Sequence, residues 1–233
     1  WSLGQFGLNG KLYAQVMDID GNKKWGANGI VINDVHGEHS ELRMTKDRST
    51  GEYYFLWKDG RRINIANDIY AQKLNSSGQA QWTQNGILLS NTPYAFTSTA
   101  ISLNDNGVYV AWAEANNPQG HGIYVLRLNP DSSFAWQNGP VRVNTTFDSP
   151  SLITLNPDIT NGGALVLFNP SVTNTGYDVH AKYINATGVL GGVTSIGDES
   201  LNQPNDFYLL QNYPNPFNPT TKIMFTIPYV ETH

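Results

Sequence analysis

Apolar residues fall into short stretches along this chain, and most of these stretches end at Gly, Asn or Asp. An extended segment places alternate side chains on opposite faces. Residues 69–74 fit this period of two, which is the period of a β-strand. Residues 53–57, 108–112 and 164–168 are apolar on both faces, as is typical of a strand between two packed sheets. We therefore expect an all-β fold in which tight turns join short strands.

The pattern is an internal repeat with a period of 54–57 residues. Its four copies, the last one weaker, span residues 12–33, 69–90, 123–144 and 179–196. One aromatic series recurs with them and consists of Trp25, Trp82 and Trp136. A second, interleaved series consists of Trp1, Trp57, Trp112 and Phe168. Repeats of this length with several strands each are typical of β-propeller blades.

Four strands are expected in each repeat. Strand one is predicted at 41–46, 99–103 and 151–155, and strand two at 53–57, 108–112 and 164–168. Strand three is predicted at 13–17, 69–74, 123–128 and 179–184, and strand four at 30–33, 87–90 and 141–144. This organisation predicts a partial β-propeller of about three and a half four-stranded blades.

The recurring tryptophans are expected to fill the wedges between neighbouring blades, because one such ring buries about 150–250 Å². The run Asp68 to Leu74, followed by Gly78 and Trp82, resembles the propeller-like repeats of large secreted bacterial proteins. That resemblance implies blades with an Asp-Ile-Tyr-Ala-Gln-Lys/Arg-Leu strand followed by Gly and Trp.

Composition narrows the function classes. The net charge of −5 argues against a nucleic-acid partner, which favours a basic face. Cysteine is absent, so stability must come from the core or from bound ions. No apolar run approaches the roughly 18–20 residues that a membrane span needs, so we expect no membrane span. The chain starts at Trp1 without an export signal, which favours a fragment of a longer protein.

A metal site is the first candidate for chemistry. The segment HGEHSE contains the densest group of metal-capable side chains, namely His36, Glu38, His39 and Glu41. Imidazole and carboxylate groups bind divalent ions such as zinc. The residues lie in a predicted inter-blade loop, where the spacing imposes no geometry. A bound divalent metal and a solvated loop are therefore both open, and no other cofactor is expected.

Two other charged segments have simpler interpretations. Residues 18–22 (DIDGN) do not keep the Gly and Glu positions of a helix–loop–helix calcium site, so a tight turn is favoured. Residues 58–62 (KDGRR) form a basic loop tip or a contact for a carbohydrate or an anion. No carboxylates are paired by spacing and no nucleophile motif occurs, so the sequence favours a protein without catalysis of its own.

The segment at 212–228 reads NYPNPFNPTTKIMFTIP. Its first half contains three closely spaced prolines, Pro214, Pro216 and Pro219. Each proline removes a backbone donor and fixes φ, so neither a helix nor a central strand fits there. Alternation then predicts a half-buried strand over 223–227.

This segment resembles the opening of the C-terminal sorting domain of the type IX secretion system of Bacteroidetes-like bacteria. The residues that match the family pattern are Leu209, Asn212, Tyr213, Pro214, Asn215, Pro216, Phe217, Asn218, Pro219 and Thr221. The resemblance covers residues 207–228 and implies the start of a β-sandwich, the type IX machinery as partner, and a secreted or outer-surface location. A proline-rich linker is the alternative.

We therefore expect propeller-like repeats over 1–196, a linker over 197–211 and a truncated sorting domain over 212–233. The predicted function is binding or display at the cell surface, through adhesion or capture of an extracellular glycan or protein. Two rivals remain open. The propeller can be an accessory part of a secreted hydrolase, or the chain can be a purely structural surface-layer subunit.

Overall fold

The computed structural model describes most of the repeat region. The described residues are 2–3, 10–62, 68–91, 95–104, 107–115, 122–144, 151–158, 161–169, 179–191, 208–209 and 225–226. The chain divides into two compact units, residues 1–192 and 193–233, and we describe each by itself.

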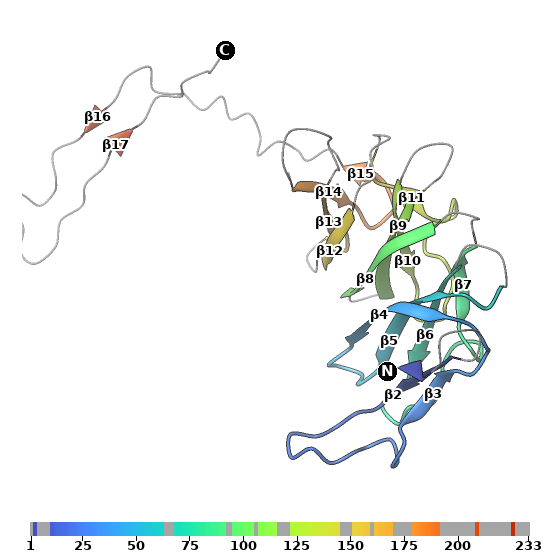
Figure 1. Ribbon diagram of the computed structural model, residues 1–233. Coiled ribbons are helices and arrows are strands. Elements are labelled where there is room, and N and C mark those ends of the chain that lie inside the picture. The colour runs from blue at the N-terminus through green and yellow to red at the C-terminus, as the bar shows by residue number, and fades with distance from the viewer. Residues whose placement is uncertain are drawn as a thin grey trace, which may run out of the picture. The chain divides into compact units, whose positions relative to one another are not determined.

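The first unit consists of antiparallel sheets whose strands follow one another in chain order (Figure 1). Blade 1 contains β1 (Ser2–Leu3), β2 (Lys11–Ala14) and β3 (Ile30–Asn33). Blade 2 contains β4 (His39–Lys46), β5 (Tyr53–Asp59), β6 (Asp68–Leu74) and β7 (Ile87–Ser90). Blade 3 contains β8 (Ala95–Asn104), β9 (Gly107–Ala115), β10 (Gly122–Leu128) and β11 (Val141–Arg142). Blade 4 contains β12 (Ser151–Pro157), β13 (Ala164–Asn169), β14 (His180–Ile184) and β15 (Leu190–Gly191).

This architecture confirms the all-β prediction and the assignment of four-stranded blades. Two predicted strands end early. Residues 141–144 were expected to form a strand, but β11 ends at Arg142. Residues 13–17 were expected to be extended throughout, but β2 ends at Ala14. Beyond it, Met17 forms an isolated bridge with Lys23. The turn over Asp18–Asn22 therefore begins from this single bridge, separate from the strand.

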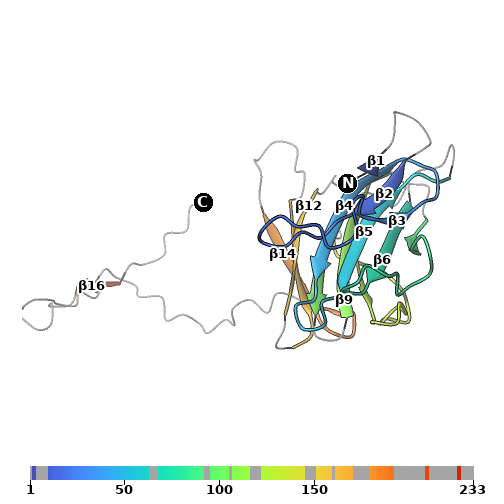
Figure 2. The same cartoon turned by 90° about the horizontal axis from the view of Figure 1, so that it is seen from below.

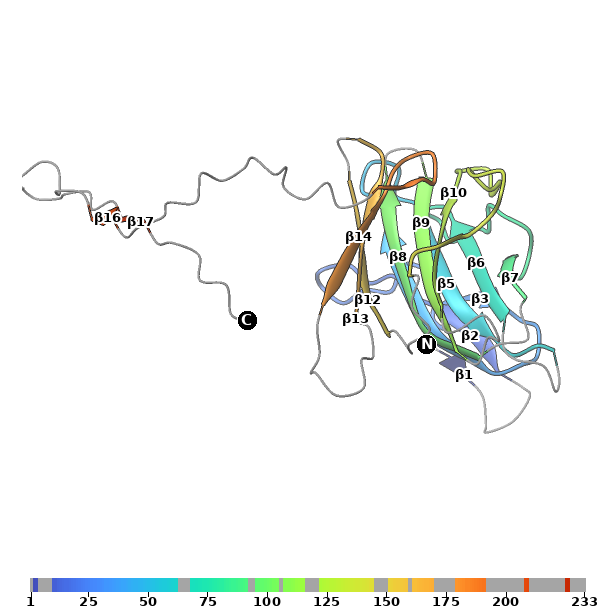
Figure 3. The same ribbon diagram turned by 90° about the horizontal axis from the view of Figure 1, so that it is seen from above.

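Successive blades pack side by side through their first two strands (Figures 2 and 3). The first strands β4 and β8 contact each other, and so do β8 and β12. Each of these strands carries one extra residue at a β-bulge near its start. The bulge in β4 exposes the carbonyl of Glu41, which accepts a hydrogen bond from Thr99 Oγ1 of blade 3 at 2.8 Å. The bulge thus provides a contact between blades.

The second strands form the centre of the core. All residues of β5 except Lys58 are buried, as are the residues of β9 from Val108 to Glu114. The cause is their position between two neighbouring sheets, which was expected from their apolar character on both faces. In blade 4, β13 alternates instead, and Leu165 remains 37% exposed. The described residues thus cover only one face of that strand.

The first tryptophan series joins each blade to the next. Trp25, Trp82 and Trp136 are all buried, and each indole Nε1 donates to a backbone carbonyl one repeat further along. The acceptors are Ser76, Pro130 and Ala186, at 3.1, 3.0 and 3.0 Å respectively. The acceptors all lie in the turn between the third and fourth strands. These tryptophans therefore lie at the junctions between blades, where the repeat predicts them.

The turn that accepts the indole has the same build in several blades. In blade 2, Asn75 Oδ1 accepts from the backbone nitrogens of Ser77 and Gln79 at 3.0 and 2.9 Å. Gly78 in this turn has φ of +84°, and a Cβ there would lie 2.8 Å from the side chain of Ile30. Glycine therefore satisfies both the left-handed backbone and the close approach of the preceding blade.

In the second unit, the described residues form one antiparallel pair, β16 (Tyr208–Leu209) with β17 (Phe225–Thr226). Phe225 falls within the strand predicted over 223–227. The sorting motif at 212–219 lies outside the described residues. No helix long and apolar enough to cross a membrane is found in the described part of the chain.

Candidate functional site

A buried carboxylate, that of Asp59, lies at the end of β5, two residues after Trp57 of the second aromatic series. Because residues two apart share a face of a strand, Trp57 and Asp59 point the same way. Trp57 Nε1 donates to Asp59 Oδ2 at 2.8 Å, and both side chains are fully buried. The register places Trp57 opposite Tyr70 of β6, and the two rings stack with centroids 6.1 Å apart.

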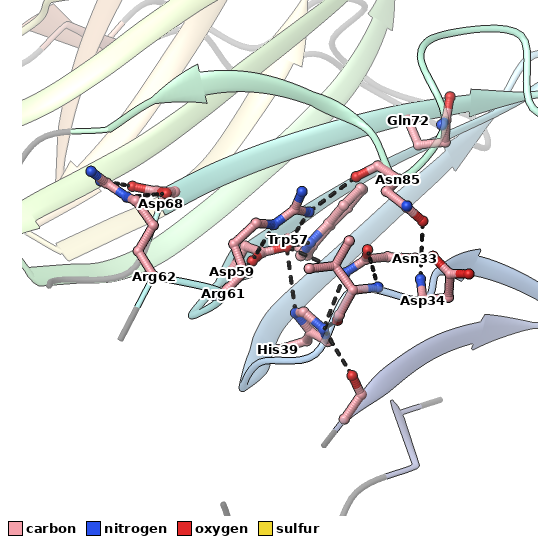
Figure 4. A network of polar contacts seen from close by, with 12 residues as sticks. Asn33, Asp34, His39, Trp57, Asp59, Arg61, Arg62, Asp68, Gln72 and Asn85 are labelled. Atoms are coloured by element: carbon pink, nitrogen blue, oxygen red, sulfur yellow. Dashed lines mark hydrogen bonds and ion pairs between the residues drawn. The ribbon is translucent and has the colours of Figure 1, made fainter. Parts of the chain in front are cut away.

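Arg61 turns back onto this carboxylate (Figure 4). Its Nε donates to Asp59 Oδ1 at 2.8 Å and its Nη2 to Oδ2 at 2.7 Å, which is the bidentate geometry that arginine favours. Nη2 also donates to the carbonyl of Asn85 at 3.0 Å. The guanidinium carbon lies 3.8 Å from the centre of the Tyr70 ring, so the cation stacks on an aromatic face.

Two residues from the neighbouring elements complete the surroundings of Asp59. Asn33, the last residue of β3, donates from Nδ2 to Asp59 Oδ2 at 3.3 Å. His39, the first residue of β4, has a fully buried side chain with Nδ1 3.5 Å from Asp59 Oδ2. Its Nε2 lies 3.1 Å from the carbonyl oxygen of Gly10 and 3.2 Å from that of Val35. Blades 1 and 2 thus meet around one carboxylate.

The surroundings of Asp59 favour the charged form of its carboxyl group. Burial by itself raises the pKa of this carboxyl, but the hydrogen bonds from Arg61 and Trp57 and the charge of Arg61 outweigh it, so the pKa is lowered. A general acid at neutral pH needs the opposite shift. Asp59 is therefore suited to an ion pair with Arg61 of the same blade, and not to proton donation.

Blade 3 repeats this arrangement at the end of β9. Trp112 Nε1 donates to Glu114 Oε1 at 3.2 Å, and both residues are buried. Trp112 pairs with Tyr124 of β10, and their rings stack with centroids 6.1 Å apart. A cavity of about 280 Å³ opens here, lined by Leu89, Ser90, Asn91, Trp112, Glu114, Tyr124 and Pro140. We call it the blade-3 pocket.

A second hollow of about 370 Å³ lies between β3 and the turns that follow β6. Asp34, Trp82 and Asn85 are among its lining residues. The backbone nitrogen of Asp34 donates to Asn85 Oδ1 at 3.0 Å, which ties blade 1 to blade 2 beside this hollow.

The residues of the proposed metal site do not converge. His39 points inward to Asp59, whereas Glu41 Oε2 pairs with Arg43 Nη2 at 2.9 Å. His36 and Glu38 are exposed. Across the described ranges, no group of three or more His, Cys, Asp or Glu residues is placed to hold a metal ion. The geometry therefore gives the metal hypothesis no support.

The turn at residues 18–22 uses its first carboxylate internally. Asp18 Oδ1 accepts from the backbone nitrogens of Asp20 and Asn22 at 3.1 and 2.8 Å. Its Oδ2 pairs with Lys24 at 2.8 Å. The hydrogen bond from Lys24, followed by those from Asn22, lowers the pKa of Asp18 to about 2. This is the tight turn that the sequence favoured.

The basic segment at 58–62 differs from its prediction. It was interpreted as a charged loop tip or a surface contact, but Arg61 is only 17% exposed and holds Asp59. Arg62 Nε donates to Asp68 Oδ2 at 2.7 Å, and its Nη2 to the carbonyl of Asn91 at 3.1 Å. Sequence reasoning missed this network. Its signal was the carboxylate two residues after each second-strand tryptophan, Asp59 and Glu114.

Comparisons with known proteins give weak likenesses. No family model matches the chain, and no curated protein matches it. Among solved structures, it is similar to an endo-arabinase from Bacteroides thetaiotaomicron VPI-5482, at 13% identity and a TM-score of 0.43, over 77% of this chain and 68% of that one. It is also similar to an alpha-L-arabinofuranosidase from Lactobacillus brevis, at 9% identity and a TM-score of 0.38, over 64% of this chain and 50% of that one. At these scores neither likeness bears on substrate or chemistry.

Proposed function

We propose that this chain is a propeller-type binding module that captures or displays an extracellular glycan or protein. The observation that carries the proposal is the blade-3 pocket, where a stacked pair of rings, Trp112 and Tyr124, lies beside the buried carboxylate of Glu114. Aromatic faces and a few fixed polar groups are the usual components of ligand sites.

The ionised groups described above support binding over catalysis. Asp59 has a lowered pKa because of its hydrogen bonds with Arg61 and Trp57, although burial opposes them. Asp68 is held by Arg62. A carboxyl group with a lowered pKa does not exchange protons near neutral pH, so Asp59 serves to anchor a loop. The role of these ion pairs is to hold a rigid frame that presents the blade-3 pocket to a ligand.

The test is binding to arrays of immobilised glycans and of extracellular peptides, with Tyr124→Leu as the matched variant. Retention on either array that the variant loses would support the proposal. Retention that is equal for wild type and variant, or absent from both arrays, would overturn it. A parallel assay for reducing ends released from the retained glycans addresses the hydrolase alternative. Release would replace capture with catalysis as the function.

We further propose export to the outer surface or the medium through type IX secretion, on the strength of the motif at 212–219. The test expresses the whole chain behind an export signal in a host with this machinery. Loss of surface or medium protein when Pro214, Pro216 and Pro219 are changed to Ala, with periplasmic protein retained, would support it. Equal secretion from a host without the machinery would contradict it.

A further inference from the structure

The turn between the third and fourth strands has the same backbone in all four blades. In blade 1 the backbone nitrogen of Asp18 donates to the carbonyl of Asn22 at 3.1 Å, and that of Gly21 donates to the carbonyl of Asp18 at 3.0 Å. The same two bonds recur in the turns of blades 2, 3 and 4, at 2.9 to 3.0 Å. The fourth residue of the turn is a glycine with φ of +84° in blades 1, 2 and 4. The blade-1 turn thus has the backbone of the turns that accept a tryptophan.

The side chain just before this turn is buried in three blades and exposed in the first. Leu74, Leu128 and Ile184 hold this position in blades 2, 3 and 4, and each is at most 1% exposed. Leu74 lies in one apolar cluster with Trp25 of the preceding blade. Met17 holds the position in blade 1 and is 58% exposed. An apolar position that the repeat otherwise buries is therefore open on blade 1, which marks it as an interaction surface.

The glycine of the turn shows which group covers the other blades. A Cβ on Gly78 would lie 3.2 Å from Cε2 of Trp25, and one on Gly188 would lie 2.7 Å from Cδ2 of Trp136. Among the described residues, the atom that a Cβ on Gly21 would meet is the methyl carbon of Met17, at 4.0 Å. The ring of a preceding tryptophan therefore covers the turn in blades 2 and 4, and the same place on blade 1 is open.

The acceptor carbonyl follows the same division. The carbonyls of Ser76, Pro130 and Ala186 each accept an indole N–H from the preceding blade. Ile19 stands at this position of the blade-1 turn and is fully exposed. In the part of the chain that the structure describes, its carbonyl accepts no hydrogen bond. We call Met17, Ile19 and Gly21 together the blade-1 turn surface.

The tryptophans of the chain identify the partner that fits this surface. Trp25, Trp82 and Trp136 each follow the first residue of their turn by seven positions, and each already donates to the next blade. In the fourth repeat the residue at this position is Gly192, so a second copy of the chain has no further tryptophan of this series to donate. Residues 193–233 contain no tryptophan. The indole must come from a further blade.

We propose that the blade-1 turn surface binds a further tryptophan-bearing blade of this same repeat. The indole Nε1 of that blade donates to the carbonyl oxygen of Ile19, and its ring covers Gly21 and Met17. The contact continues the interface that joins blade 1 to blade 2, blade 2 to blade 3 and blade 3 to blade 4. It does not involve the blade-3 pocket, so it is independent of the proposed binding function.

The experiment joins an added copy of residues 35–111 directly before Trp1 of the whole chain. This segment contains one complete blade, β4 to β7, and keeps the phase of the repeat because Trp1 and Trp112 belong to the same series. Its Trp82 is thereby placed to donate to Ile19 of the original chain. The readout is oxidation of Met17 by hydrogen peroxide, followed by mass spectrometry of the tryptic peptide 12–23, which the added segment lacks.

We expect Met17 to be oxidised at least about tenfold more slowly in the extended chain than in the original chain, because the added blade covers its side chain. Trp82→Ala in the added blade should restore the fast oxidation. The control is Leu88→Ala in the added blade, at a residue that is 41% exposed, and it should keep Met17 protected. Equal rates in the original and extended chains would overturn the proposal, and so would protection that survives Trp82→Ala.

A second extension and a test of the original chain address the remaining outcomes. An added copy of residues 91–167 places Trp136 at the same point, and it decides if the first extension does not fold. Fast oxidation of Met17 in both extensions, folded or not, would overturn the proposal. Light scattering of the original chain over a dilution series should show a monomer. A dimer in which Met17 is protected would assign the surface to a second copy and overturn the proposal.

Discussion

The indole Nε1 of Trp82 in blade 2 donates to the carbonyl oxygen of Pro130 in blade 3 at 3.0 Å. The same bond recurs from Trp25 to Ser76 and from Trp136 to Ala186. Because the acceptor is a backbone oxygen, the residue that carries it can differ between repeats, whereas the donor is a tryptophan each time. Each of these blades is therefore linked to the next by a hydrogen bond from a tryptophan side chain to a backbone carbonyl.

Truncation of Trp82 tests this junction. We expect Trp82→Ala to lower the free energy of unfolding by about 3–5 kcal/mol, because it removes a large buried ring and leaves a cavity. Trp82→Phe keeps much of the packing and loses the hydrogen bond, so we expect a smaller loss of about 1–2 kcal/mol. Urea denaturation measures both.

The control for Trp82 is Ile19→Ala, because Ile19 is 100% exposed. We expect its free energy of unfolding to change by less than about 0.5 kcal/mol. An unfolding midpoint for Trp82→Ala equal to that of Ile19→Ala would contradict the role of Trp82 at the junction.

The buried pair of Asp59 and Arg61 predicts strong coupling. Asp59→Asn leaves a cation with 17% exposed side chain without its counter-charge, and we expect a loss of about 3 kcal/mol. Arg61→Met alone leaves the carboxylate uncompensated. A double-mutant cycle over the two changes should give a coupling of about 1–3 kcal/mol, measured by urea denaturation. Additive losses would show that the two groups act independently.

Acid should weaken the same ion pair. The pKa of Asp59 is lowered in the folded chain from an ordinary value of 3.8, so its contribution is present above that pH and is lost as the pH falls through the folded pKa. We expect the difference in unfolding free energy between wild type and Asp59→Asn to narrow below about pH 3.8. Denaturation curves at several pH values measure it, and a constant difference would contradict the assignment.

Two glycines with left-handed backbones separate strain from packing. Gly139 has φ of +72° and open space around a built Cβ, whereas a Cβ on Gly78 meets Ile30 at 2.8 Å and Trp25 at 3.2 Å. We expect Gly139→Ala to cost about 1–2 kcal/mol from backbone strain alone. Gly78→Ala should cost more, because blade 1 must also move. Equal melting midpoints for the two variants would show that the contact with Trp25 carries no energy.

The strands and the repeat could be predicted from the sequence because both depend on local signals. Alternation locates β6, and apolar character on both faces locates β5 and β9. An asparagine directly follows each of the third strands β6, β10 and β14. The position of Trp82 at a blade junction follows from its recurrence at a fixed period. These features need no knowledge of what lies across the sheet.

The polar network could not be predicted because it depends on contacts across blades. Arg61 in the segment KDGRR has the local pattern of an exposed loop, and its orientation is set by the burial of Asp59 beneath Asn33 of the preceding blade. His39 turns inward for the same reason, which draws it away from Glu41 and from the predicted metal site. The repeat also concealed a difference between blades, since the residue two positions after the carboxylate is Arg61 in blade 2 and Asn116 in blade 3.

The most direct test of the account is the indole region of an NMR spectrum of the ¹⁵N-labelled chain, recorded during titration with the glycan or peptide that the arrays retain. Trp112 lines the blade-3 pocket, whereas Trp25, Trp82 and Trp136 lie at the blade junctions. The account predicts a saturable shift of the Trp112 Nε1–H signal while the three junction signals stay in place. Shifts at the junction tryptophans without one at Trp112, or no shift at any of them, would contradict it.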